Sequence, residues 1–137
     1  MARAMTIGGL AKAAAVNVET IRYYQRLGLI DEPRRPLGGQ RSYPLTTVGK
    51  LAFIRRAQQL GFTLAEIREL LRLAGSNSRA AVRRIAQSRY SKLALQADQL
   101  IAMSKRLKSL LDKSQRRHGR GADPIVAALR GEEPLPS

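Results

Sequence analysis

The segment from Arg79 to Arg117 contains neither glycine nor proline, and it constrains the fold more than any other part of the chain. As one helix rising about 1.5 Å per residue, it would span roughly 55–60 Å. Apolar side chains recur along it at heptad spacing, with Ser104 as a polar interruption. The remaining residues make too small a head to cover so long a stripe, so the pattern predicts pairing with a second copy. The positions predicted to form this seam are Tyr90, Leu93, Ala97, Leu100, Leu107 and Leu111.

Ahead of this segment, residues 7–26 carry the pattern of a helix-turn-helix. Apolar residues follow helical spacing over Thr6–Ala14, and a polar interruption at Asn17 then breaks the pattern. Asn17 is a favourable N-cap for a second helix, which is expected to run to about Leu27 and to stop at Gly28. Two short helices joined by a tight turn are therefore predicted.

Residues 29–43 differ in character, because prolines and glycines break any regular element and three arginines lie among them. Leu29-Ile30 and Gln40–Tyr43 are expected to pair as short strands around a basic loop, which would form a wing beside the helix-turn-helix. The loop arginines either contact phosphates or only keep the loop soluble. They are Arg34, Arg35 and Arg41.

Three more helices are expected, so the fold class is mainly α. One runs over Thr46–Leu60. The sequence Thr63-Leu64-Ala65-Glu66 has the pattern of a capping box and predicts another helix through about Leu73. A last short helix is predicted at Pro124–Arg130, where Asp123 suits the N-cap and proline suits the first helical position.

The chain is strongly basic, with a formal net charge of +15. Lys and Arg outnumber Asp and Glu by 12 to 5 in residues 1–75 and by 13 to 5 in residues 76–137. The positive charge is therefore spread over both halves of the chain and is not confined to a tail. This charge favours nucleic acid, and a membrane surface is the second choice. The longest uncharged run, Ala57–Ala65, is too short to span a bilayer, and no signal peptide is visible, so a cytoplasmic location is expected. The leucine seam favours self-pairing over membrane binding.

An enzymatic function is disfavoured by the residues present. The chain has no cysteine, which excludes disulfides, thiolate metal sites and a cysteine nucleophile. Its one histidine, His118, lies in an arginine-rich turn and is expected to be solvated. No phosphate-binding glycine loop and no carboxylate pair with a supporting base are visible. The sequence predicts a binding protein without a cofactor.

The second helix of a helix-turn-helix enters the major groove, where its N-terminal part reaches base edges. Arginine grips guanine or phosphate with two hydrogen bonds, and threonine or tyrosine hydroxyls suit phosphate or base contacts. The alternative is that Tyr23 and Tyr24 are aromatics at the edge of the core and that Arg22 is a solvated charge. The residues of this helix predicted to contact DNA are Val18, Thr20, Arg22, Tyr23, Tyr24 and Arg26.

Three stretches of the sequence resemble the MerR family of transcription regulators, and most of all its mercury-responsive branch. They read TIGGLAKAAAVNVETIRYYQRLGLI, PLGGQRSY and FIRRAQQLGFTLAEIRELLRL, and the resemblance extends without gaps from Thr6 to Gly131. It implies a winged helix-turn-helix head at residues 1–75. It also implies a dimerisation region at residues 76–137, whose long helix (about 79–117) forms an antiparallel coiled coil in a homodimer, followed by a loop and the short helix.

The resemblance also implies a mode of action. Family members bind a promoter whose two polymerase-contact elements are separated by an overlong spacer, and they hold it silent. On effector binding they bend and untwist the DNA so that RNA polymerase can use the promoter, which is indirect readout. Carried onto this sequence, Arg22 and Tyr23 match recognition-helix contacts, and Arg41 and Tyr43 match wing contacts with phosphate.

In the mercury-responsive branch, three cysteines bind the ion across the dimer. The matching positions here are Arg79, Ser114 and Asp123, and none is a thiolate. Hg²⁺ prefers sulfur, and a cation at the first position would repel it, so mercury is not supported as an effector. The sequence predicts a dimeric regulator that represses or activates a promoter. The alternative is an architectural protein that binds DNA by charge alone, without sequence preference.

Overall fold

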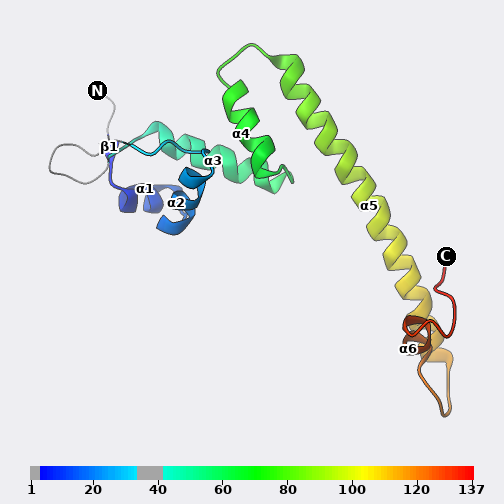
Figure 1. Ribbon diagram of the computed structural model, residues 1–137. Coiled ribbons are helices and arrows are strands. Elements are labelled where there is room, and N and C mark those ends of the chain that lie inside the picture. Colours follow the sequence, from blue (N-terminus) through cyan, green and yellow to red (C-terminus); the bar gives the residue numbers. More distant parts are fainter. Residues whose placement is uncertain (1–3, 34–41) are drawn as a thin grey trace. The chain divides into compact units, whose positions relative to one another are not determined.

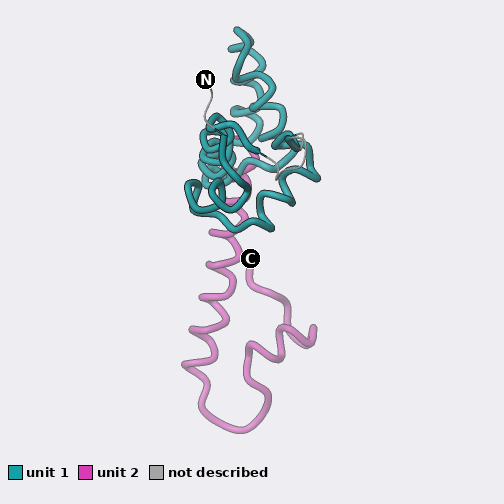
Figure 2. Tube along the Cα trace, turned by 90° about the vertical axis from the view of Figure 1, so that its left-hand side faces the viewer, with its two compact units in different colours: residues 1–89 teal, residues 90–137 magenta. Residues whose placement is uncertain are grey.

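The computed structural model describes residues 4–33 and 42–137 (Figure 1). The contacts of the chain divide it into two compact units, residues 1–89 and 90–137 (Figure 2). The long helix α5, Arg79–Arg116, begins in the first unit and continues into the second. Among the described residues, no helix combines the length and the apolar character that crossing a membrane requires.

The first helix, α1 (Ile7–Ala14), is fixed at both ends by local interactions. The hydroxyl oxygen of Thr6 accepts a hydrogen bond from the Gly9 amide at 3.1 Å, which caps the N-terminus. The helix stops at Ala15, which has φ 56° and ψ 41°. A side chain in this left-handed region is uncommon, and here it turns the backbone sharply toward the second helix.

The second helix, α2 (Val18–Arg26), starts where the sequence predicts. Asn17 Oδ1 accepts hydrogen bonds from both the amide and the hydroxyl of Thr20, each at 2.8 Å, so the predicted N-cap is confirmed. Beyond the helix, Gly28 has φ 74°, a conformation that glycine adopts without steric cost. The two helices with their tight turn form the predicted helix-turn-helix.

The next helices are α3 (Thr46–Gln59) and α4 (Leu64–Leu73). At the start of α4 the predicted capping box is present. The Glu66 amide donates to the Thr63 hydroxyl at 3.2 Å, and the Thr63 amide donates to Glu66 Oε1 at 2.8 Å. Two backbone amides at this terminus thereby find side-chain acceptors.

The small sheet differs from the predicted hairpin. Strand β1 (Ala4–Met5) pairs antiparallel with β2 (Tyr43–Pro44), with Met5 opposite Tyr43. The predicted pairing of Leu29-Ile30 with this segment is wrong. Both residues lie in bends and are 5% and 3% exposed, so their apolar side chains serve the core and not a strand. The rest of that hairpin, including Gln40 and Arg41, lies outside the described residues.

The core of the first unit draws one deeply buried side chain from each of five elements. Burying side chains of this size supplies the main driving force for folding. Each of the helices α1 to α4 therefore contributes one of these side chains to a shared cluster. The residues less than 2% exposed are Leu10, Ile21, Tyr43, Ile54 and Ile67.

In the second unit, the last short helix, α6 (Pro124–Leu129), follows the end of α5. Asp123 caps it, since Asp123 Oδ1 accepts from the Ile125 amide at 2.8 Å. The tail beyond α6 returns to α5, because Arg106 Nε donates to the Pro136 carbonyl at 2.9 Å. Leu110 is the one buried residue of α5, all of which the structure describes.

Candidate nucleic-acid interface

Helix α2 has two faces with different chemistry. Ile21 and Tyr24 are buried in the core at 0% and 9% exposure, one turn apart. Arg22, Tyr23 and Arg26 are exposed on the other side of the helix. This division follows from the helical period, because residues three or four apart share a face. The core therefore fixes the axis of α2 while leaving a cationic and aromatic face free.

The exposed face is partly ordered by its own contacts. Arg22 Nη1 lies 3.0 Å from Glu19 Oε1, in an ion pair whose side chains are 54% and 73% exposed. The Arg26 guanidinium lies 5.9 Å from the centroid of the Tyr23 ring, within cation–π range. These exposed contacts are weak, so they bias the side chains without preventing other partners from replacing them.

The N-terminal residues of α2 have more limited freedom. Val18 is half-buried and packs against the core, so little of it is available for a base contact. The Thr20 hydroxyl donates to Asn17 Oδ1, and its oxygen can still accept a hydrogen bond. A hollow of about 240 Å³ lies farther along, lined by Arg22, Gln25, Arg26 and Glu32.

Two tyrosines of the predicted set lie in the core. The Tyr24 hydroxyl donates to Gln58 Oε1 at 3.2 Å, which corresponds to the alternative of a core-edge aromatic. Tyr43 is 1% exposed, and its hydroxyl oxygen accepts a hydrogen bond from Gln25 Nε2. Tyr24 thus joins α2 to α3, and Tyr43 joins β2 to α2. Arg34, Arg35 and Arg41 lie outside the described residues.

Two contacts that the sequence did not predict tie α4 to the end of α2 and to α5. Arg68 of α4 donates to the Leu27 carbonyl at the end of α2. Glu66 accepts from Arg89 Nη2 at 2.7 Å, and these two side chains are only 18% and 11% exposed. Burial raises the Glu66 pKa, but hydrogen bonds from the Thr63 amide and from Arg89 outweigh burial and hold the pKa below its ordinary value.

The predicted seam of α5 is exposed in the single chain. Tyr90 is 67% exposed and Leu100 61%, and Leu93, Leu107 and Leu111 are between 40% and 54%. Ala97 is exposed as well. Apolar surface of this extent along one helix is characteristic of a face that meets another chain.

The three positions matched to the ligand cysteines of the mercury-responsive branch hold side chains with other roles. The Ser114 hydroxyl donates to Asp123 Oδ2, and this bond, followed by the Ile125 amide, lowers the Asp123 pKa. Asp123 is also the N-cap of α6, and Arg79 is an exposed cation. Hydroxyl, carboxylate and guanidinium do not form a soft donor set, so these residues do not fit Hg²⁺. Nowhere in residues 4–33 and 42–137 do three His, Cys, Asp or Glu side chains gather as metal ligands.

The chain matches two family profiles. The one described as "MerR HTH family regulatory protein" covers residues 5–74, and the one described as "MerR, DNA binding" covers residues 48–110. The mercuric resistance operon regulatory protein of Serratia marcescens is 40% identical over 129 residues, which are 94% of this chain and 90% of that protein.

Solved structures with similar folds agree with these matches. The transcription regulator PbrR691 of Ralstonia metallidurans CH34, in complex with lead(II), has a TM-score of 0.79 and 30% identity, covering 90% of this chain and 98% of that one. MerR of Bacillus megaterium MB1, in complex with mercury(II), has a TM-score of 0.66 and 33% identity, covering 92% and 99%. The chain therefore belongs to the MerR family of helix-turn-helix proteins, which are DNA-binding transcription regulators and not enzymes.

Proposed function

We propose that this chain is a dimeric transcription regulator of a mercuric-resistance-type operon, and that it binds double-stranded promoter DNA through α2. The observation that carries the proposal is the division of α2 into a buried face and an exposed face with Arg22, Tyr23 and Arg26. The identity of 40% with the Serratia regulator supports the type of operon.

The exposed face offers the groups that a major groove requires. Arg22 can leave its exposed pair with Glu19, because a phosphate or the edge of a guanine offers a stronger, two-bonded partner. Tyr23 adds a hydroxyl on a rigid ring, and Arg26 stacks over that ring. The net charge of +15 supplies attraction to any duplex, so specificity must come from these side chains and from DNA shape.

The dimer rests on the exposed seam of α5. Pairing two copies of α5 antiparallel would bury Leu93, Leu100 and Leu107 against their equivalents. A two-fold dimer presents two copies of α2 to two half-sites, so its binding site is palindromic. RNA polymerase at the same promoter is the further partner. Bending and untwisting of the spacer by the dimer switches the promoter between repression and activation.

We also propose that the protein does not sense mercury through thiolates. The Ser114–Asp123 hydrogen bond supports this, because it uses two of the three positions in a local structural contact. Titration of Hg²⁺ into the purified protein on promoter DNA tests the proposal. Binding with the affinity typical of a thiolate site would contradict it.

The DNA-binding proposal is tested by a specificity ratio. Binding to a palindromic promoter duplex from a mercuric-resistance operon is compared with binding to a scrambled duplex, at one near-physiological salt concentration. We expect a ratio well above about ten. Arg22→Ala should weaken promoter binding by about 1–3 kcal/mol and lower the ratio, because it removes a base or phosphate contact.

Arg55→Ala is the matched control, because Arg55 is an exposed arginine of α3 and its loss changes the net charge equally. This variant should weaken binding to both duplexes alike. The alternative function, charge-driven architectural binding, is favoured by the net charge of +15 alone. Equal affinity for both duplexes, with Arg22→Ala and Arg55→Ala behaving identically, would establish that alternative.

A further inference from the structure

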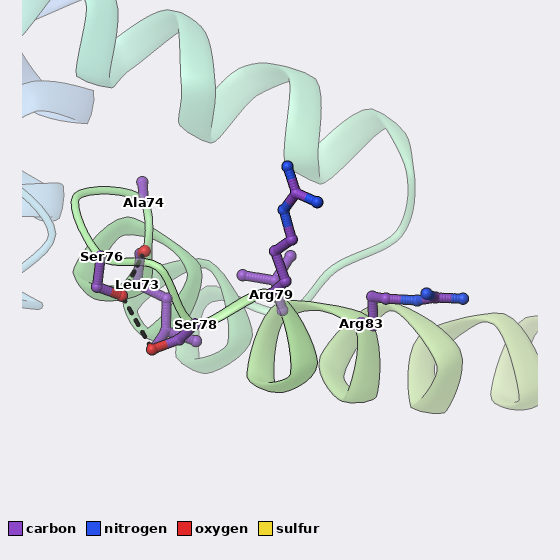
Figure 3. Close-up of a pocket in the computed structure, with 7 residues that line it drawn as sticks. Leu73, Ala74, Ser76, Ser78, Arg79 and Arg83 are labelled. Atoms are coloured by element: carbon purple, nitrogen blue, oxygen red, sulfur yellow. Dashed lines mark hydrogen bonds between the residues drawn. The ribbon is translucent and has the colours of Figure 1, made fainter.

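Two hollows of the first unit are lined by arginines, and they differ in how those side chains are arranged. The larger, about 470 Å³, lies between the end of α4 and the first turns of α5 (Figure 3). Its arginines, Arg79 and Arg83, point away from each other and do not converge on one group. The smaller, about 240 Å³, lies on the face of α2 proposed above to meet DNA. Its lining residues are Arg22, Gln25, Arg26 and Glu32.

The smaller hollow contains one neutral side chain, that of Gln25. Arg22 lies three residues before Gln25 and four before Arg26, so helical spacing places all three on one side of α2. Both arginines are exposed, whereas Gln25 is half-buried. The glutamine is therefore more shielded from water than the two cations beside it.

The Gln25 amide is held by a residue of the core. Its Nε2 donates a hydrogen bond to the Tyr43 hydroxyl at 2.5 Å. Tyr43 is 1% exposed, and its strand pairs with β1 through Met5. A ring confined in this way has little freedom, so its hydroxyl fixes one end of a side chain that otherwise has several rotamers. This order lowers the entropic cost of any further contact that Gln25 makes.

The hydrogen bond to Tyr43 uses only part of the amide. Glutamine has two N–H groups and a carbonyl oxygen, and Tyr43 takes one N–H. One remaining donor beside one acceptor matches the N7 acceptor and the N6 amino group that adenine presents in the major groove. A phosphate offers acceptors alone, and the Glu32 carboxylate that lines the same hollow would repel it. The hollow therefore suits the edge of a base better than a phosphate.

We propose that Gln25 recognises an adenine in the promoter through N6 and N7, and that Tyr43 is its positioning residue. The inference rests on the function proposed above, because it requires α2 to lie in a major groove. It adds to that function a residue that determines sequence preference. The sequence did not single out Gln25, since its contact with Tyr43 spans 18 residues.

The test uses promoter duplexes in which one adenine of a half-site at a time is replaced by 7-deazaadenine. This base keeps its pairing and its amino group but lacks the N7 acceptor. We expect the wild-type protein to bind the duplex modified at one position about three- to ten-fold more weakly than the unmodified promoter, because one of two base contacts is lost. Gln25→Ala should bind these two duplexes with affinities within about two-fold of each other. Fluorescence anisotropy at one salt concentration measures both.

Two further variants separate base reading from a purely structural role. Gln25→Glu keeps the shape of the side chain and can accept a hydrogen bond from the Tyr43 hydroxyl, but it has no donor for N7. It should therefore lose the sensitivity to 7-deazaadenine as Gln25→Ala does. Tyr43→Phe releases the amide and should reduce this sensitivity without abolishing it. An unchanged sensitivity in Tyr43→Phe would remove the positioning role.

Gln59→Ala is the matched control, because Gln59 is an exposed glutamine of α3 that does not line the hollow. It should keep the full sensitivity to 7-deazaadenine. Full sensitivity in Gln25→Ala, equal loss in Gln59→Ala, or wild-type binding that no modified adenine weakens would overturn the proposal. So would equal weakening of promoter and scrambled DNA by Gln25→Ala, which indicates a phosphate contact.

Failure of this inference is distinguishable from failure of the proposed function. A protein without preference for the promoter over the scrambled duplex contradicts the proposed function itself. A protein that keeps this preference, and whose sensitivity to 7-deazaadenine is the same in Gln25→Ala as in the wild type, refutes only the role of Gln25.

Discussion

The helices of the head and the long helix α5 differ in where their apolar side chains go. In the head, Ile21, Ile54 and Ile67 are each 0% exposed. On α5, Leu100 and Leu107 are 61% and 54% exposed, although they belong to a regular heptad pattern. The head therefore satisfies its apolar faces within one chain, whereas α5 needs another surface. In the proposed dimer, the head would contact DNA and α5 would join the two copies.

The largest effect is expected on the α5 side of this comparison. Leu100→Asp places a charge in the seam, and an unpaired buried charge costs about 3–5 kcal/mol, enough to separate the dimer at micromolar concentration. Sedimentation equilibrium measures the result. Leu95→Asp is the control, because Leu95 is 59% exposed on the same helix but lies outside the heptad positions. If Leu100→Asp stays dimeric, the coiled-coil assignment is lost.

On the head side, removal of a buried side chain should destabilise the single chain. Ile54→Ala leaves a cavity where no surface is exposed, and the expected loss is about 2–5 kcal/mol in the free energy of unfolding. Chemical denaturation monitored by circular dichroism measures it. Leu60→Ala, at a residue that is 65% exposed, should change stability by less than about 0.5 kcal/mol. Similar losses for both variants would mean that the described core is incorrect.

A smaller effect is expected where α4 meets the start of α5. Glu66→Gln removes the carboxylate that pairs with Arg89 and should cost about 1–3 kcal/mol of stability near neutral pH. Because the Glu66 pKa is lower in the folded chain, the contribution is complete above the ordinary value of 4.5 and disappears as the pH falls through the folded pKa. The difference between variant and wild type should therefore shrink in acid. Glu69→Gln, which affects an exposed pair, should cost less than Glu66→Gln near neutral pH.

The smallest effect concerns the end of α5. Ser114→Ala removes the hydrogen bond that is the main cause of the lowered Asp123 pKa, so this pKa should rise toward its ordinary value of 3.8. A nuclear magnetic resonance titration of the Asp123 carboxyl measures the shift. In the wild type, the contribution of Asp123 to stability is present above 3.8 and is lost as the pH falls through the folded pKa. An unchanged Asp123 titration in the variant would exclude this contact.

Most of the helical framework was predictable because its signals are local. Asn17, Thr63 and Asp123 each cap a helix within three residues, and such caps are visible in the sequence. The heptad pattern likewise predicted α5, which ends at Arg116 and not Arg117, within the usual uncertainty of helix ends.

Contacts between distant residues were not predictable. The partner of β2 was predicted wrongly, because β1 has only two residues and shows no alternation. The exposed Tyr23 and the buried Tyr24 are adjacent and chemically identical, so only the packing of α2 into the core distinguishes them. The ion pair between Glu66 and Arg89 spans 23 residues, and the hollow beside Arg79 depends on the path of the chain between two helices.

The central claim is that two heads, joined through α5, read one DNA site with α2. The number of chains bound to one palindromic promoter duplex, measured by sedimentation velocity, tests it most directly. The account predicts two chains on each promoter duplex, and Arg22→Ala should weaken this complex by about 1–3 kcal/mol while keeping its weak association with scrambled DNA. Single chains bound to either duplex with equal affinity, unchanged by Arg22→Ala, would contradict it.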